Sequence, residues 1–110
     1  MNLISLIFGK QYNILAYLPE AVLVIDENGK ILYSNKMALK LFETTRLRGK
    51  NINDYFITNS DNIIRNRNEE IKQILKIVSE EQNTKITDVK VVDVSSKKNK
   101  RYILTIIDNT

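Results

Sequence analysis

Side chains that could carry out chemistry are few in this chain. It contains no His and no Cys, so it lacks the commonest general base, the commonest metal ligand and any thiolate nucleophile. Carboxylates such as Asp26, Asp54 and Asp93 fall at predicted turn or strand positions, and no nucleophile, base or further ligand is spaced to work with them. The residue types therefore indicate a protein that is not an enzyme, and they predict no metal site.

The composition is that of one ordinary globular domain. Hydrophobic residues make up 43% and charged residues 27% of the 110 residues, enough to bury a core. The 17 basic and 13 acidic residues are interleaved, so we expect no nucleic-acid partner. The apolar run from Leu3 to Phe8 is too short to cross a membrane. The absence of Cys fits a reducing compartment, and we expect a cytoplasmic location.

The stretch from Ala21 to Phe42 organises the rest of the chain. Two apolar runs flank the pair Asn28-Gly29, which tolerates the positive φ that a tight hairpin needs. Asn35 then precedes an amphipathic run, where its side-chain oxygen could cap the first turn of a helix. The pattern predicts a β-hairpin followed by a capped helix.

Alternation along the two strands predicts which side chains face inward. Asp26 shares a face with Val22 and Val24, so we expect Leu23 and Ile25 to point into the core. In the second strand Ser34 marks the outer face. Ile31 and Tyr33 are therefore expected on the inner one.

The amino-terminal residues are predicted to form a helix that ends at Pro19. Its apolar side chains fall at heptad a and d positions, and we consider four of them candidates for a dimer interface: Ile4, Ile7, Ile14 and Leu18. This helix could pack on the sheet of its own domain or pair with a second copy, and the sequence leaves both alternatives open.

The second half of the chain is predicted to contain a long helix from Asn59 to Gln82 and two strands. The connection before the helix, Thr44 to Thr58, suits one short helix. Lys85 to Val94 is the first strand, with a β-bulge at Val91-Val92, where alternation slips. Arg101 to Asp108 is the second, and it is apolar enough on both faces to be central. The basic residues of the turn between them favour a solvated hairpin tip over an anion site: Lys97, Lys98, Lys100 and Arg101.

The order of these elements resembles the PAS sensory domain. The resemblance lies in the run from Val24 to Asn35, in the glycine-containing segment Leu47 to Ile52, and in the ending Asp108-Asn109-Thr110. It covers Tyr12 to Thr110, and Lys36 stands where the family often has Pro. It implies an α+β fold in which an antiparallel sheet of about five strands, four of them clear in the sequence, carries helices on one face. An amino-terminal flanking helix (residues 1–19) would precede the sensory domain (residues 20–110).

The resemblance also implies a function. Family members bind small molecules between sheet and helices, and the inward candidates for such a pocket are Leu23, Ile25, Tyr33, Leu41, Phe56, Ile64 and Tyr102. Without His or Cys, a histidine-ligated haem or a flavin held as a cysteine adduct is not expected, so we predict no cofactor. The implied function is sensing, with signals passed through flanking helices to an output domain such as a kinase on another segment or protein. The alternative is a homodimerisation domain with a filled core and no ligand.

Overall fold

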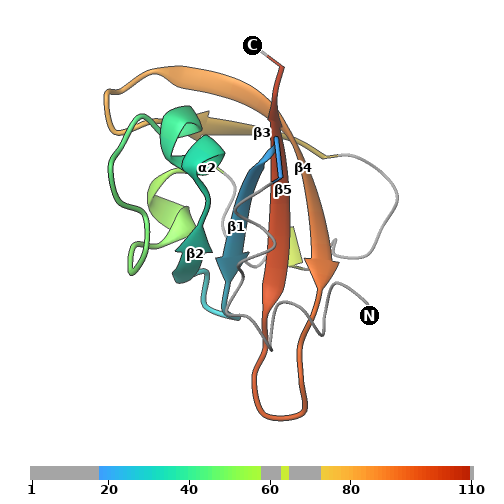
Figure 1. Cartoon of the computed structure of the whole chain (residues 1–110). Coiled ribbons are helices and arrows are strands. Elements are labelled where there is room, and N and C mark those ends of the chain that lie inside the picture. The colour runs from blue at the N-terminus through green and yellow to red at the C-terminus, as the bar shows by residue number, and fades with distance from the viewer. Residues whose placement is uncertain (1–17, 58–62, 65–72, 110) are drawn as a thin grey trace.

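A five-stranded antiparallel sheet forms the body of the computed structural model (Figure 1). The structure describes residues 18–57, 63–64 and 73–109. The elements are β1 (Ala21–Ile25), β2 (Ile31–Ser34), α2 (Lys36–Leu41), the 3₁₀ turn η2 (Ile52–Asp54), β3 (Gln73–Val78), β4 (Thr84–Asp93) and β5 (Tyr102–Asp108). The strand order is β2-β1-β5-β4-β3, so β5 is central, as its two apolar faces predicted.

The predicted hairpin and capped helix are confirmed. In the turn, Asp26 Oδ1 accepts hydrogen bonds from the backbone N–H groups of Asn28 and Lys30 at 2.9 and 3.0 Å, and Gly29 has a φ of 84°. Asn35 is the N-cap of α2, and its Oδ1 accepts from Ala38 N at 3.0 Å. Local side-chain hydrogen bonds therefore fix both ends of this unit.

Two groups of buried side chains lie on opposite faces of the sheet. The inner cluster faces α2 and η2 and consists of Ala21, Leu23, Ile25, Ile31, Ala38, Leu41, Phe42, Leu47, Ile52, Tyr55, Phe56, Ile63, Ile77, Val89, Val91, Tyr102, Leu104 and Ile106. The outer cluster consists of Val22, Val24, Val94 and Ile103, against which Leu18, Tyr33 and Val92 pack. The inward orientation predicted for Leu23 and Ile25 is confirmed.

The predicted face of Tyr33 is wrong, because β2 contains a bulge. Ile31 pairs with Ile25 of β1, whereas Tyr33 pairs with Val24, so the register shifts by one residue between them. Such a shift moves a side chain to the opposite face of a sheet. Ile31 therefore joins the inner cluster, and Tyr33 packs on the outer one.

The bulge predicted at Val91-Val92 is absent. The pairing of β4 with β5 is continuous from Thr87 opposite Asp108 to Asp93 opposite Tyr102. Val91 lies in the inner cluster and Val92 packs on the outer one. Both valines are apolar because both faces of the sheet are covered there.

The predicted helix from Asn59 to Gln82 is wrong in its second half. Ile63 and Ile64 are helical, but residues 73–78 form β3, which pairs with β4 from Gln73 opposite Val89 to Val78 opposite Thr84. Residues 59–62 and 65–72 lie outside the described residues. In the described part of the connection before them, residues 44–57, η2 is the short helical element that the sequence predicts.

The expected amino-terminal helix lies mostly outside the described residues. Of the four dimer candidates, Ile4, Ile7 and Ile14 fall there. Leu18 is described, and its half-buried side chain packs against the outer cluster. Among the described residues, no helix is long and apolar enough to cross a membrane.

Candidate functional site

A hollow of about 380 Å³ lies where the chain enters and leaves the sheet. It is lined by Pro19, Glu20, Ala21, Met37, Lys40, Leu41, Lys85, Ile106, Ile107 and Asp108. We call it the terminal hollow. Its lining combines the start of β1, one side of α2, the start of β4 and the end of β5.

The floor of the terminal hollow is apolar. Ala21 and Ile106 pair directly across β1 and β5, and they are buried together with Leu41. Met37 and Ile107 also line the hollow but are 40% and 42% exposed. This combination of apolar surface and polar surroundings is typical of a small-molecule site.

Asn35 holds α2 against the start of β1. Its Oδ1 accepts from Val22 N at 3.0 Å as well as from Ala38 N, and its Nδ2 donates to Glu20 O at 2.8 Å. The amide is 2% exposed. One buried side chain therefore fixes the position of two of the walls of the hollow.

Charged side chains lie around the terminal hollow: Glu20, Lys40, Lys85 and Asp108. Of these, Lys85 contacts residues at the end of α2 and just after it. Its Nζ donates to Leu41 O at 2.7 Å and lies 3.0 Å from Glu43 Oε1. The pKa of Glu43 is lowered by hydrogen bonds, first from Glu81 and then from Lys85 and Asn83. The pKa of Glu81 is raised, because it donates to Glu43 and lies beside its charge. Lys85 thus anchors β4 to the end of α2.

A second polar group joins η2 to the turn between β3 and β4. The Tyr55 hydroxyl donates to Glu80 Oε1 at 2.8 Å, and Lys50 forms an ion pair with the same carboxylate. Hydrogen bonds from Lys50, Thr44 and Tyr55 lower the pKa of Glu80 to about 2. Burial, and then Glu80, raise the pKa of Tyr55. Lys50, Tyr55 and Glu80 line a further hollow of about 490 Å³. Their contacts hold η2 and the residues before it against the turn between β3 and β4.

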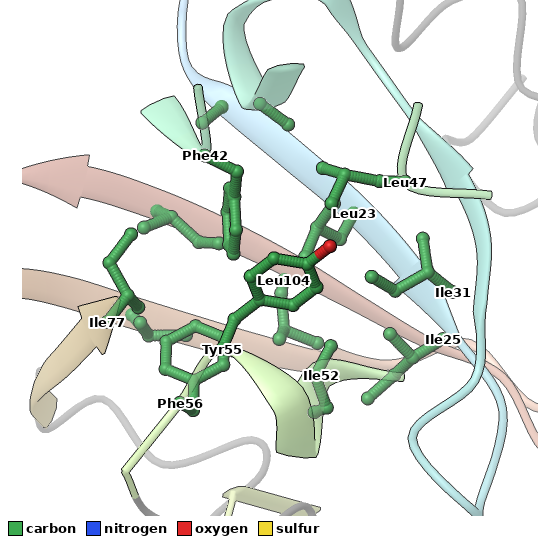
Figure 2. Packing of buried hydrophobic residues seen from close by; sticks show 14 of the residues in the cluster. Leu23, Ile25, Ile31, Phe42, Leu47, Ile52, Tyr55, Phe56, Ile77 and Leu104 are labelled. Carbon is green, nitrogen blue, oxygen red and sulfur yellow. The ribbon is translucent and has the colours of Figure 1, made fainter. Parts of the chain in front are cut away.

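The predicted pocket residues do not all lie together. Leu23, Ile25, Leu41, Phe56 and Tyr102 belong to the inner cluster, and Ile64 packs against it. Phe42 packs edge to face on Tyr55 and Phe56, with ring centroids 5.1 and 6.2 Å apart; Figure 2 shows these rings among the other core side chains. Tyr33 lies on the opposite face. Leu41 lines the terminal hollow, and the other six predicted pocket residues do not.

Most of the lining of the terminal hollow is not predicted from the sequence. Met37 and Lys40 lie one helical turn apart on α2, and Ile106 alternates onto the same face of β5 as Tyr102, a predicted pocket residue. The signal that could have found them is this spacing, combined with the pairing of the first and last strands. That pairing is not local, so no pattern within one segment indicates it. Among the described residues, no group of three or more acidic side chains could hold a metal ion.

Comparisons with known proteins agree with this architecture. The family model for the PAS fold matches residues 11–108, so the chain belongs to the PAS family. A search of curated proteins found no match.

Solved structures share the fold at low sequence identity. A PAS domain from a two-component sensor histidine kinase is 14% identical, with a TM-score of 0.78 over 96% of this chain and 98% of that one. The PAS domain of an HTR-like protein from Haloarcula marismortui is 13% identical, with a TM-score of 0.73 over 92% and 90%. The PAS domain of nitrogen regulation protein NR(II) from Vibrio parahaemolyticus is 15% identical, with a TM-score of 0.67 over 98% and 99%.

Proposed function

We propose that this chain is the sensory module of a signalling protein and that it binds a small molecule in the terminal hollow. The observation that carries the proposal is the floor of the hollow, where Ala21 and Ile106 pair at the end of the β1–β5 ladder. A molecule resting there contacts the first and last strands at once. Membership of the PAS family supports a sensory role.

The lining defines the chemistry of the ligand. The apolar floor suits an apolar body. Lys40 and Glu20 border the hollow, and neither side chain has an ion-pair partner in the part of the chain that the structure describes. We therefore expect an amphipathic molecule with an apolar chain and one charged end.

Binding would be transmitted through the segments that border the hollow. Asn35 couples α2 to Glu20 and Val22, so a ligand that shifts α2 also shifts the entry to β1. A ligand can bias such a switch only as far as it binds one arrangement more tightly than the other. The flanking helices would carry the signal to an output domain, such as a kinase on another segment or protein. A solved PAS domain with a similar fold comes from a two-component sensor histidine kinase. The absence of catalytic activity and of a cofactor, and a cytoplasmic location, remain predictions.

A homodimerisation domain with a filled core is the second candidate. One observation favours it: four of the predicted pocket residues are buried side chains of the inner cluster, namely Leu23, Ile25, Phe56 and Tyr102. In this reading the flanking segment of two copies would assemble, and the inner cluster would serve only as a core.

Native mass spectrometry of the freshly purified chain separates these candidates, because one spectrum reports both mass and any retained molecule. The proposal predicts an added small mass that is lost in Met37→Glu. The matched control is Ile86→Glu, since Ile86 is also exposed, at 46% against 40% for Met37, and does not line the hollow. A dimer without added mass favours the second candidate. An empty monomer contradicts both.

A further inference from the structure

Another hollow, of about 360 Å³, lies at the opposite end of β5 from the terminal hollow. It is lined by Lys30, Ile31, Leu32, Arg46, Arg48, Gly49 and Arg101. Four of these seven residues are cationic and none is acidic. We call it the basic hollow.

The loop after α2 presents two of the four cations. Leu47 is fully buried in the inner cluster, whereas its neighbours Arg46 and Arg48 are exposed. Thr44 Oγ1 accepts from Arg46 N at 3.4 Å. Arg46 Nε donates to Arg48 O at 3.4 Å. The buried leucine therefore anchors the loop so that both guanidinium groups lie outside the core.

Backbone hydrogen bonds join this loop to the start of β2. Gly49 N donates to Ile31 O at 2.8 Å, and Ile31 N donates to Lys50 O at 2.7 Å. Gly49 has a φ of 89°, and apart from the glycine itself and its two chain neighbours no atom lies within 4 Å of the place where a Cβ would stand. The loop is thus fixed beside Lys30, and its glycine faces open space.

The fourth cation comes from a distant part of the chain. Arg101 N donates to Ser95 Oγ at 2.9 Å, and Arg101 O accepts from Val94 N at 2.9 Å. Its Nη1 donates to Lys100 O at 2.7 Å. Of the predicted basic hairpin tip, Lys97, Lys98 and Lys100 are exposed as expected. Arg101 instead borders the hollow.

In the part of the chain that the structure describes, these cations lack the carboxylate partners that other basic residues have. Lys50 pairs with Glu80 and Lys85 with Glu43. Within the described ranges, no ion pair joins Lys30, Arg46, Arg48 or Arg101 to a carboxylate. Asp26, in the same turn as Lys30, directs its Oδ1 to backbone amides. The fold gathers four positive charges around one concavity, where they attract an anion.

We infer that the basic hollow binds a small anion that carries phosphate groups. Three of the four cations are arginines, whose planar guanidinium groups match phosphate oxygens in pairs. The charges converge on a concavity of limited volume rather than along a face, which favours a compact molecule over a nucleic-acid strand. This inference goes beyond the proposed function, since the two hollows share no lining residue.

Isothermal titration calorimetry with inorganic pyrophosphate at low salt tests the inference. The variants are Arg46→Gln/Arg48→Gln and Arg101→Gln, which remove charge from two different segments of the hollow. The control is Lys97→Gln/Lys98→Gln, which removes two charges from the exposed hairpin tip. Citrate serves as the carboxylate probe, and a single-stranded oligonucleotide as the polymer probe.

The inference predicts that pyrophosphate binds the unmodified chain and binds at least ten-fold more weakly to the double arginine variant. Arg101→Gln weakens binding several-fold, and the hairpin-tip variant changes it less than two-fold. Citrate binds at least ten-fold more weakly than pyrophosphate. The inference is overturned if pyrophosphate does not bind, if citrate matches it, or if the hairpin-tip variant loses as much affinity as the double arginine variant. It is also overturned if the oligonucleotide binds more tightly than pyrophosphate.

Discussion

Asn35 Oδ1 accepts a hydrogen bond from the backbone N–H of Val22 at 3.0 Å, and this contact ties the start of the first strand to the start of α2. The same oxygen caps the helix through Ala38 N. Asn35 is therefore both a local cap and the link between two walls of the terminal hollow.

Replacing Asn35 with Ala should destabilise the domain by roughly 2–4 kcal/mol. The substitution removes a helix cap, at about 0.5–2 kcal/mol, and leaves the buried N–H of Val22 without its acceptor, at about 1–3 kcal/mol. Urea denaturation measures the change. Asn35→Asp, which keeps an acceptor for both amides but loses the donor to Glu20 O, should cost less than Asn35→Ala. Equal stability of the alanine variant and the unmodified chain would refute the structural role.

Replacing Phe42 with Ala should cost about 3–5 kcal/mol, because the ring is fully buried and its loss leaves a cavity beside Tyr55 and Phe56. Ile57→Ala is the control, since Ile57 is 65% exposed and its truncation should change the free energy of unfolding by less than about 0.5 kcal/mol. Chemical denaturation of both variants tests the difference. Similar losses for the two would show that Phe42 is not part of a packed core.

Glu80 should make the stability of the domain depend on pH in the acid range. Its pKa in the folded chain, about 2, lies below the ordinary value of 4.5, so the folded state favours the charged carboxylate. The resulting stabilisation is complete above the ordinary pKa and is lost as pH falls from about 4.5 towards 2. Glu80→Gln should flatten the decline of the urea midpoint over this interval.

The control for Glu80 is Glu27→Gln, a substitution in the exposed β1–β2 turn. This variant should follow the pH profile of the unmodified chain. Superimposable profiles for Glu80→Gln and the unmodified chain would mean that the contacts of Glu80 with Lys50, Thr44 and Tyr55 do not stabilise the fold.

Replacing Gly49 with Ala should cost roughly 1–2 kcal/mol, the penalty of a left-handed conformation for a residue with a Cβ. The cost is conformational, because no atom beyond residue 49 and its two chain neighbours lies within 4 Å of the added carbon. Gly49→Asn should be milder, since Asn adopts positive φ more readily than Ala. Thermal or urea unfolding of the pair checks this order. If Asn were the more damaging replacement, side-chain bulk rather than φ would limit the position.

Local patterns predicted the elements that local interactions fix. The hairpin around Gly29 and the cap at Asn35 depend on residues close in sequence, and the central position of β5 follows from its own two apolar faces. The β3 strand was predicted as helix because its apolar spacing suits either element, and pairing with β4 decides the outcome. Tyr33 was assigned to the wrong face because one bulged residue reverses the alternation.

The candidate sites were harder to predict than the fold. Leu23 and Ile25 were correctly directed inward, but the terminal hollow depends on Met37, Lys85 and Ile106, which meet only through the sheet order. The basic hollow likewise combines Lys30, the loop at Arg46 and Arg48, and Arg101. No segment on its own contains the pattern of either site, since each is assembled by strand pairing and by the buried anchor Leu47.

The most direct test of the proposed function is a ¹H–¹⁵N NMR titration with decanoate and, separately, decylamine, two probes with an apolar chain and one charged end. We predict that one of them shifts the amide signals of Ala21, Met37 and Ile106 most strongly. Met37→Glu should abolish these shifts, and Ile86→Glu should leave them intact. The absence of shifts with both probes, or shifts that Met37→Glu leaves unchanged, would contradict a ligand site between the entry to β1 and the end of β5.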